Sequence, residues 1–409
     1  MRKVLVIAHG HPELNKGGGE QAAYHFYKEC LKQGDDAYFL ARTDAIPHGG
    51  AAFSIINPPR EILMHTTHDD HFLFSNIKTR HLWGDFKGLL EKIQPEVIYI
   101  HHYFHLGIEV IKVIKDTLPN CKIVMTLHEY HAICANGGLM KKSSGELCYR
   151  SGTLDCSRCF KGSTFGPGEF YLRKRYIQTF FKLIDHFVSP SAFLKKRYVE
   201  WGIASEKITV IENGQPTLNI SESEKGSSDS LSLCYIGQIN PNKGLDVLLE
   251  AITLLPEEIK QRVQVDVHGS GLENQSPDYQ KKIQKLVKKS KKSVRLHGRY
   301  QAEDVGNILS SAQWLIVPSI WWENSPMVIQ ESLNCGVPLI VSDIGGMAEK
   351  VENNVTGLHF RVGKPLALAN RIVQIAEDKD LHTQLASNIT PPLSLADAYK
   401  KTMDIVKQC

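Results

Sequence analysis

Two carboxylates, Glu323 and Glu331, stand in the second half of the chain with seven residues between them. Pro326 favours the first turn of a helix, so Met327 and Glu331, four positions apart, would share one helix face. That face could look back toward the loop that carries Glu323. The two carboxylates could then accept hydrogen bonds from one ligand, unless they are solvated surface residues that flank a helix by chance.

The same segment offers hydrogen-bond donors. At a helix start near residue 326, the N–H groups of Ser325, Met327 and Val328 would have no partner inside the helix, and such groups bind anions. Lys243 lies where another loop enters a helix, so its ammonium and first-turn N–H groups could share a phosphate, unless the lysine is simply solvated. These residue types fit a ligand that is both phosphorylated and rich in hydroxyls.

Strand-like segments surround the two carboxylates. An apolar run at 314–317 ends at Pro318, and a second run at 339–342 follows the helix stop signals Gly336 and Pro338. This succession predicts one strand–loop–helix–strand unit of a parallel sheet. Ligands of such sheets bind beside the carboxyl ends of the strands.

The beginning of the chain follows the same plan. A continuous apolar run at 3–8 predicts a central parallel strand, and a loop with Gly17, Gly18 and Gly19 leads into an amphipathic helix that ends near Gly34. Glycines let backbone N–H groups approach a phosphate closely. The loop is therefore a candidate phosphate cradle, with a mobile connection as the alternative.

Several histidines follow later strands of the first half. His128 comes directly after a predicted strand at 122–127, which places it at the ligand-binding edge of a doubly wound sheet. The neighbouring His101, His102, His105 and His131 could suggest a metal site. They lack paired carboxylates and a fixed helical register, so we expect no catalytic metal there.

A polar, glycine-rich stretch at 134–159 carries Cys134, Cys148, Cys156 and Cys159. Four thiolates can hold one tetrahedral zinc ion, which would supply folding energy to a loop without a core of its own. Free or redox-pairing thiols are the alternative. The odd total of nine cysteines, spread over a long chain, is otherwise typical of reduced cytosolic thiols.

Composition limits the class of protein. A chain of 409 residues is too long for one ordinary core and suits two domains, and 42% hydrophobic with 22% charged residues is typical of a soluble globular protein. The net charge of +4 does not indicate nucleic-acid binding, and we expect no nucleic-acid partner. No apolar run reaches the length of a membrane span, and the first nine residues are typical of a strand, not of a signal peptide.

Two further stretches concern organisation and partners. A polar stretch predicts a linker at 219–230, between a first domain at 1–218 and a second at 231–385, with a helical segment at 386–409.

Residues 161–202 carry eight basic and three acidic residues, interleaved with aromatic ones. This pattern predicts either a helix on an anionic bilayer surface or a helix with core aromatics and a solvated charged face.

The pattern from Pro318 to Glu349, PS-x3-ENSP-x4-ES-x2-CGVP-x4-DIGG-x2-E, closely resembles the donor-binding segment of family 4 retaining glycosyltransferases. The resemblance covers the whole chain, is strongest over 231–360, and extends to the cysteine loop of a bacterial subset. It implies the GT-B fold, with two Rossmann-like, doubly wound α/β domains that face a cleft. The first domain would bind the acceptor and the second the nucleotide sugar, and the C-terminal helix would pack back onto the first.

The resemblance also implies roles for individual residues. The donor-binding residues that it implies are Gly18, Gly19, Gln238, Lys243, Arg299, Ser325, Pro326, Met327, Val328 and Glu331. The catalytic residues that it implies are Glu323, His128 and Lys243. Glu331 would accept hydrogen bonds from the ribose diol, while Glu323 and His128 would orient the transferred sugar or the acceptor. Gln238 stands where the family has an arginine, so this site would lack one positive charge on the diphosphate.

These roles describe a retaining glycosyltransferase that moves a sugar from a UDP- or GDP-sugar to a glycan or lipid-linked acceptor in surface polysaccharide, lipopolysaccharide or glycolipid assembly. Catalysis would need no cofactor, apart from structural zinc if the cysteine loop binds it. The enzyme would be cytoplasmic or peripheral at the inner face of the cell membrane. Two alternatives stay open: a GT-B sugar-nucleotide epimerase, and a non-catalytic partner subunit that binds nucleotide sugar, which Gln238 suggests.

Overall fold

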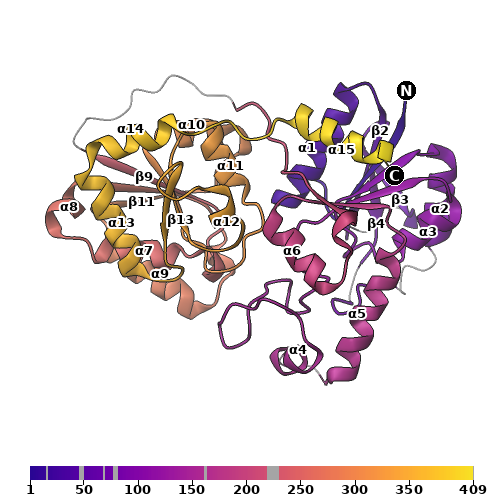
Figure 1. The fold of residues 1–409 in the computed structure, drawn as a ribbon, viewed down its shortest axis with the longest axis horizontal. Coiled ribbons are helices and arrows are strands. Elements are labelled where there is room, and N and C mark those ends of the chain that lie inside the picture. The colour runs from indigo at the N-terminus through magenta and orange to yellow at the C-terminus, as the bar shows by residue number, and fades with distance from the viewer. Residues whose placement is uncertain are drawn as a thin grey trace. The chain divides into compact units, whose positions relative to one another are not determined.

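The computed structural model describes residues 1–14, 17–45, 50–67, 70–76, 82–160, 164–218 and 230–408. The chain divides into two compact units, which are residues 1–214 with 393–409 (unit 1) and residues 215–392 (unit 2). Figure 1 labels many of the helices and strands of both units. The predicted linker at 219–230 lies outside the described residues except for Ser230, and Lys161 of the basic stretch lies outside them as well.

Unit 1 contains an eight-stranded sheet in the order β3-β4-β2-β1-β5-β6-β7-β8. Its strands are β1 (Lys3–Ala8), β2 (Asp36–Thr43), β3 (Phe53–Asn57), β4 (Glu61–His65), β5 (Val97–Ile100), β6 (Lys122–Thr126), β7 (His186–Ser189) and β8 (Ile208–Val210). All neighbours pair in parallel except β3 with β4. The side chains of residues 4–8 are fully buried, as expected of a central parallel strand, so the apolar run in the sequence marked this strand correctly.

The helices of unit 1 come from both ends of the chain. They are α1 (Gly18–Lys32), α2 (Leu82–Ile93), α3 (Val110–Thr117), α4 (Thr153–Cys159), α5 (Pro167–Phe181), α6 (Ala192–Trp201) and α15 (Leu395–Gln408). The last helix, α15, packs against α1 (Figure 1). Its Met403 and Ile405 lie in the same hydrophobic core as Val4 and Val6 of β1, so the end of the chain completes the core in which the chain begins.

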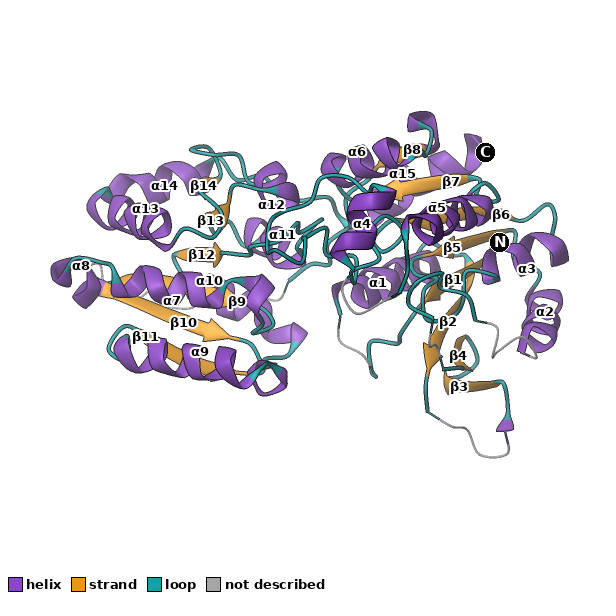
Figure 2. Cartoon of the chain, turned by 90° about the horizontal axis from the view of Figure 1, so that it is seen from below, coloured by secondary structure: helices purple, strands orange, loops and turns teal. Residues whose placement is uncertain are grey.

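Unit 2 contains a six-stranded, fully parallel sheet in the order β11-β10-β9-β12-β13-β14. Its strands are β9 (Leu231–Ile236), β10 (Val263–His268), β11 (Val294–Gly298), β12 (Trp314–Val317), β13 (Leu339–Ser342) and β14 (Gly357–Phe360). Its helices are α7 (Leu245–Thr253), α8 (Glu257–Arg262), α9 (Pro277–Lys289), α10 (Val305–Ser310), α11 (Met327–Asn334), α12 (Gly345–Lys350), α13 (Pro365–Glu377) and α14 (Lys379–Ser387). Figure 2 shows the alternation of strands and helices in both units.

The sheet of unit 2 is buried on both faces. Leu233 and Tyr235 of β9 lie in a core with residues of α7, α9 and α13, whereas the alternate residues Cys234 and Ile236 lie in a second core with residues of α10, α11 and α12. Burial on both faces explains why these strands are continuous apolar runs and not alternating ones. The two doubly wound α/β domains predicted from the sequence are confirmed.

Both sheets have a topological switch point, where strand order changes direction. In unit 1 the chain moves outward from β1 through β2 on one side and through β5 on the other. In unit 2 it moves from β9 through β10 on one side and β12 on the other. Doubly wound sheets bind ligands beside the strand ends at this point, so the loops after β1 and β5, and those after β9 and β12, are the places to look.

Candidate functional site

The loop after β12 presents the Glu323 carboxylate at the switch point of unit 2. Its Oε1 accepts hydrogen bonds from Lys243 Nζ at 2.7 Å, from Ser319 Oγ at 2.9 Å and from the Trp321 indole N–H at 2.9 Å. Its Oε2 has no donor among the described residues. One oxygen is therefore fully occupied in holding the carboxylate in place, and the other is left for a ligand hydroxyl.

Lys243 is positioned by its own turn as well as by Glu323. A 3-10 turn over Pro241–Lys243 precedes α7, and the Asn240 side chain accepts hydrogen bonds from the N–H groups of Asn242 and Lys243. The backbone N–H of Lys243 is thus already used, so Lys243 itself can offer a phosphate only its ammonium, and a shared role for the first-turn N–H groups of α7 stays a prediction. The ammonium also lies 5.9 Å from the centre of the Trp321 ring.

Glycines allow the loops of this site to approach one another. A Cβ on Gly244, which has a φ of +70°, would lie 2.0 Å from the carbonyl oxygen of Pro318. A Cβ on Gly346 would lie 1.8 Å from the carbonyl oxygen of Asn324, and the Gly346 N–H donates to the Glu323 carbonyl at 2.8 Å. The glycines in the loops at 237–244 and 343–346 therefore fit the backbone closely under the Glu323 loop.

Helix α11 begins at Met327, close to the predicted start at residue 326. The backbone N–H groups of Ser325, Met327 and Val328 donate to no described residue, as expected of a free helix N-terminus. Ser325 is fixed by Gln330, a fully buried residue whose amide donates to Ser325 Oγ at 2.7 Å. Three convergent donors with a positive helix end are suited to binding a phosphate.

Glu331 lies one turn into α11 and is half-buried. Burial raises the pKa of its carboxyl to about 7 from an ordinary value of 4.5. The side chain has no hydrogen-bond donor among the described residues. A carboxylate that is partly desolvated and lacks a donor can be satisfied by ligand hydroxyls, which would also return its pKa toward the ordinary range.

Gln238 and Arg299, also predicted for the donor site, are exposed, whereas Pro326 is buried. Gln238 is exposed on the loop after β9, and its backbone carbonyl accepts a hydrogen bond from the Tyr235 hydroxyl at 2.9 Å, which leaves the side-chain amide outside that bond. Arg299 follows β11, is exposed, and forms no ion pair with any described residue. The structure brings Lys243 and Glu323 into direct contact, whereas it shows no contact that links Gln238 or Arg299 to them.

In unit 1, His128 follows β6, the strand next to β5 of the switch point, as predicted. His128 Nε2 lies 2.8 Å from His101 Nδ1, and its ring stacks on His102 with centroids 4.9 Å apart. His102 Nε2 lies 3.5 Å from a Glu129 carboxylate oxygen. The protein surroundings lower the pKa of His128 to about 4 and raise that of Glu129 to about 8, because both charged forms are poorly solvated there. The cluster is therefore uncharged at these two residues near neutral pH.

The glycine loop lies against this histidine cluster. Gly18 is exposed at the first position of α1, and a Cβ on Gly19 would lie 2.4 Å from the His102 ring. Glu20, which follows, is buried and accepts a hydrogen bond from His9 Nε2 at 3.0 Å. The His9 bond lowers the pKa of Glu20 although burial opposes it. The start of α1 is thus fixed beside His102, within one small region of unit 1.

Two models of known families cover most of the chain. The model described as Glycosyltransferase Family 4 matches residues 16–217, and the model described as Glycosyl transferases group 1 matches residues 218–390. The chain belongs to the family 4 glycosyltransferases. The resemblance inferred from the pattern at 318–349 is therefore confirmed for the family, while its cysteine-loop subset stays a prediction.

Relatives of this family 4 protein include enzymes of glycan assembly. The lipopolysaccharide 1,2-N-acetylglucosaminetransferase of Salmonella typhimurium is 28% identical over 209 residues, which is 48% of this chain and 54% of that protein. The UDP-Gal:alpha-D-GlcNAc-diphosphoundecaprenol alpha-1,3-galactosyltransferase of Escherichia coli is 28% identical over 201 residues, 46% of this chain and 49% of that one. The matched stretches thus span about half the length of these curated relatives.

Solved structures share the fold of this family 4 chain along its full length. The Anabaena protein HepE in complex with UDP has a TM-score of 0.69 at 16% identity and covers 100% of both chains. The sucrose-phosphate synthase of Thermosynechococcus elongatus has a TM-score of 0.73 at 16% identity and covers 100% of this chain and 99% of its own. At this level of identity, the likeness concerns the fold, which is GT-B.

Sequence reasoning about this glycosyltransferase missed the residues that hold Glu323 and Ser325. Ser319, Trp321 and Gln330 carry no obvious chemical signature, since serine, tryptophan and glutamine are common in loops and cores. The signals were indirect: Ser319 belongs to the PS pair of the quoted pattern, and Gln330 is a polar residue on the buried side of a short helix. Glu20 and His9 were also missed as a pair, because their contact joins two different elements.

Metal-binding residues of the family 4 chain were also predicted. Cys134, Cys148, Cys156 and Cys159 are all described, half-buried and free of disulfides. Among the described residues, the set whose ligand atoms lie within 4.8 Å of one another is His11, Glu13 and Glu61, and it does not include these thiols. Asn57 bridges the two carboxylates of that set, at 2.9 and 2.7 Å, so internal hydrogen bonds already satisfy it.

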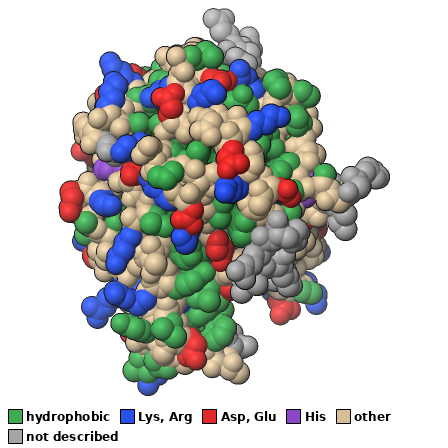
Figure 3. Space-filling model, turned by 90° about the vertical axis from the view of Figure 1, so that its right-hand side faces the viewer, with side chains coloured by type: hydrophobic (Ala, Val, Ile, Leu, Met, Phe, Trp, Pro, Cys, Tyr) green, Lys and Arg blue, Asp and Glu red, His purple; other side chains and the backbone are tan. Residues whose placement is uncertain are grey.

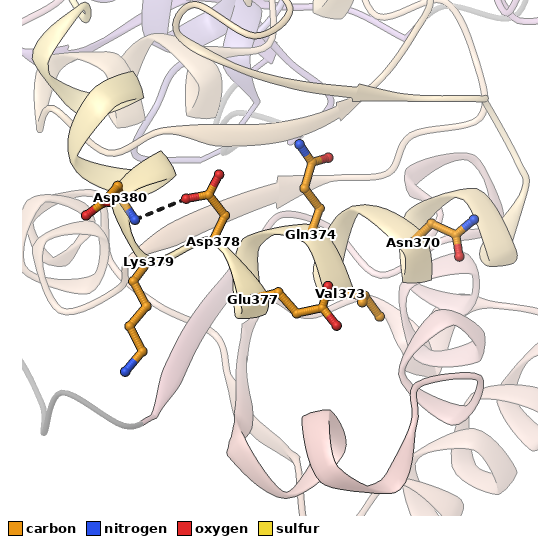
Figure 4. Close-up of a pocket in the computed structure, with 7 residues that line it drawn as sticks. All are labelled: Asn370, Val373, Gln374, Glu377, Asp378, Lys379 and Asp380. Carbon is orange, nitrogen blue, oxygen red and sulfur yellow. Dashed lines mark hydrogen bonds between the residues drawn. The ribbon is translucent and has the colours of Figure 1, made fainter.

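One surface hollow of this glycosyltransferase lies away from the predicted site residues. A hollow of about 840 Å³ on α13 and α14 is lined by Asn370, Val373, Gln374, Glu377, Asp378, Lys379 and Asp380, none of them a predicted site residue (Figure 4).

Across the described parts of the chain, no helix combines the length and the apolar character needed to cross a membrane.

Proposed function

We propose that this chain is a retaining glycosyltransferase that moves a sugar from a nucleoside diphosphate sugar to an acceptor hydroxyl. The observation that carries the proposal is the arrangement in unit 2, where the Lys243–Glu323 pair lies in the loops at the switch point. Within the described part of the chain, the first N–H groups of α11 and the Glu331 carboxylate of the same helix have no partner. A cation, an anion-binding helix end and two carboxylates are the groups that a diphosphate with two polyhydroxylated ends requires.

The leaving diphosphate sets the first demand of the reaction. Cleavage of the anomeric C–O bond leaves negative charge on the diphosphate, and aimed donors lower the barrier because they need not reorganise as that charge develops. We assign this work to the Lys243 ammonium and to the N–H groups of Ser325, Met327 and Val328. The exposed Gln238 would add a neutral hydrogen bond where an arginine would add charge.

The nucleoside and the sugar set the second demand. Glu331 would accept two hydrogen bonds from the ribose diol, and Arg299 would lie near the base. Glu323 would bind sugar hydroxyls through its free Oε2 and ease the positive charge that develops at the anomeric carbon. Retention then follows from attack on the face that the diphosphate leaves, with a phosphate oxygen taking the acceptor proton.

Unit 1 has its own proposed role. We assign the acceptor to the first domain, at 1–218, and the donor to the second, at 231–385. His128 would orient the acceptor or the sugar, and Gly18 and Gly19 would present N–H groups to a phosphate. The neutral histidine cluster favours a glycan or lipid-linked acceptor that is recognised through hydroxyls. Assembly of a surface polysaccharide, a lipopolysaccharide or a glycolipid, in the cytoplasm or at the inner face of the membrane, is the setting that we propose.

Two further parts of the proposal concern metals. Catalysis would use protein groups alone, so a chelator should leave turnover unchanged. Structural zinc in the loop at 134–159 would require the four thiols to draw together, since they do not form a set within 4.8 Å in this structure. Metal analysis of protein purified without chelator decides that point, and absence of stoichiometric zinc would exclude it.

Turnover of a panel of UDP- and GDP-sugars, followed by mass spectrometry and by proton NMR of the product anomer, tests the proposed function. We expect one donor to be consumed in the presence of acceptor glycans, and its anomeric configuration to be kept. Inversion of the anomer would contradict the proposal. Isomerisation of the donor without acceptor would show a GT-B epimerase instead, and donor binding without any turnover would show a partner subunit.

A further inference from the structure

Exposed apolar side chains are concentrated in one part of unit 1. Among the described residues, twelve large apolar side chains are exposed, and five of them fall between residues 149 and 172. We call four of these the apolar tip: Leu154 of α4, Phe165 just before α5, and Tyr171 and Leu172 of α5. In Figure 1, α4 and the first turns of α5 extend away from the sheet of unit 1, at the lower end of the view.

The apolar tip is held rigidly from behind. Phe165 stacks on Phe72 with ring centroids 4.2 Å apart, and Phe170 meets the same Phe72 ring edge-on at 5.1 Å. The buried Arg173 of α5 donates to the carbonyls of Phe72 and Ala132, each at 2.7 Å. The exposed side chains therefore need little further ordering when they bind a partner, which lowers the entropic cost of binding.

Basic side chains accompany the tip. Six exposed or half-buried ones lie between residues 141 and 175, against three acidic ones: Lys141, Lys142, Arg150, Arg158, Lys174 and Arg175, against Glu146, Asp155 and Glu169. Of these, Arg158 and Arg175 form no ion pair with described residues. Figure 3 shows green hydrophobic and blue basic side chains together at the lower end of the molecule.

We infer that this tip inserts into an anionic lipid bilayer, with Leu154, Phe165, Tyr171 and Leu172 in the interface and the basic side chains on the headgroups. This inference rests on the membrane association within the proposed function. It assigns the membrane contact to the apolar tip, where the sequence suggested a helix that lies flat on the bilayer. Phe170 and Phe181 of α5 are buried in unit 1, so α5 has no continuous apolar face to lay on a membrane. Only its first turns are free to enter one.

Charge favours the bilayer over a second copy of the chain. In a twofold dimer the same patch faces itself, so its excess of positive charge would be repelled. An anionic leaflet attracts each lysine or arginine near its surface, and buried apolar side chains add to that attraction. The combination of apolar and unpaired basic side chains at one rigid end matches this surface.

Sedimentation with vesicles tests the inference. We expect the full chain to sediment with phosphatidylcholine vesicles that contain about one third phosphatidylglycerol, and much less at ~1 M salt than at ~0.1 M. The double variant Tyr171→Ser, Leu172→Ser should bind at least about tenfold more weakly. The matched control is Leu254→Ser, Leu366→Ser, because these unit 2 side chains are exposed by 51% and 62%, close to 56% and 64% for the tip pair.

A depth measurement separates insertion from simple attraction. In the variant Leu172→Trp, brominated lipid should quench more tryptophan fluorescence than in the unaltered chain. Failure of the chain to sediment, equal weakening by both double variants, or no added quenching would overturn the inference. Loss of concentration-dependent self-association in the tip variant, with vesicle binding kept, would assign the tip to a second copy. Vesicle binding needs no donor, so its failure is distinct from failure of the proposed transfer, which is measured on a water-soluble acceptor.

Discussion

At the scale of single residues, the two oxygens of Glu323 have different surroundings. Three donors converge on Oε1, while Oε2 meets none among the described residues. A carboxylate anchored by one oxygen keeps its orientation, so a sugar hydroxyl can bind the other at little entropic cost. Lys243 has a double task in this account, since it both anchors Glu323 and offers its remaining ammonium protons to the diphosphate.

The first prediction concerns Lys243. Lys243→Ala should lower kcat/KM more than ~30-fold, or more than ~2 kcal/mol, because it removes the cation that stabilises the leaving diphosphate. The matched control is Lys282→Ala, since Lys282 is also ion-paired, with Asp246 and Glu250, but belongs to α9. Steady-state kinetics measures both, and near-normal transfer by Lys243→Ala would remove the assignment.

The second prediction concerns pH and Glu331. Burial raises the pKa of this carboxyl to about 7, so the ionised form that accepts the ribose hydroxyls is mostly lost at pH 6 and mostly present at pH 8. Affinity for a UDP-sugar should therefore rise by up to about tenfold from pH 6 to pH 8 in the unaltered chain. We expect Glu331→Gln to bind more weakly at pH 8 and to lose this pH dependence.

The raised pKa of Glu331 predicts that folding stability falls with rising pH, whereas donor affinity rises. Because the folded pKa lies above the ordinary value, the cost of the buried anion is absent below about pH 4.5 and complete above about pH 7. Glu331→Gln should thus unfold at higher temperature than the unaltered chain at pH 8. A lower melting temperature at pH 8 would show that the carboxylate is satisfied in the folded protein without a ligand.

At the scale of elements, the site depends on loops that meet through glycines. Gly346 lets the start of α12 lie against the backbone of the Glu323 loop. Gly244 lets the start of α7 lie against the backbone of Pro318. Gln330, inside α11, fixes Ser325 at the mouth of the helix. These contacts fix the loops after β9 and β12, two adjacent strands. The two loops carry the Lys243 ammonium and lead to the N-terminus of α11.

The third prediction concerns this packing. Gly346→Ala places a Cβ 1.8 Å from a backbone carbonyl oxygen, so we expect it to destabilise folding by ~2 kcal/mol or more and to weaken donor binding. Gly88→Ala is the control, because that glycine lies within α2 with nothing near its Cβ, and alanine there should stabilise by up to ~1 kcal/mol. Denaturant unfolding compares the two. Equal stability of both variants would show that the Glu323 loop can move away.

The sequence predicted these elements unevenly. Strands β1, β12 and β13 were predicted at their observed bounds, because buried parallel strands form short continuous apolar runs. Helix α3 begins only at Val110, although an apolar residue already stands at Leu106, since His105 and Gly107 adopt positive φ and form a turn there. The three donors on Glu323 were beyond prediction, because their convergence depends on how the loop after β12 folds.

At the scale of the whole molecule, the chain comprises two α/β units, each with histidines, glycines or carboxylates at its switch point. The core of unit 1 includes α15 from the end of the chain, so truncation there should affect unit 1 and not unit 2. The exact domain limits of 218, 231 and 385 stay predictions, as do the roles of the individual site residues.

The fourth prediction concerns ligand protection across the molecule. Hydrogen exchange of the full chain with a saturating nucleoside diphosphate should slow at 240–246 and 323–331, because these segments would hold the diphosphate and ribose. The α13–α14 hollow of the same unit provides the internal comparison. Protection confined to α13 and α14 would place the ligand in that hollow instead.

The most direct test of the central claim is calorimetric titration of the chain with UDP, GDP, ADP, TDP and CMP, repeated with Glu331→Ala. A donor site at Lys243 and Glu331 predicts that one nucleoside diphosphate binds with one-to-one stoichiometry and that the variant binds it at least about tenfold more weakly. Binding of none of the five, or equal binding by the variant, would contradict the account of unit 2 as a nucleotide-sugar site.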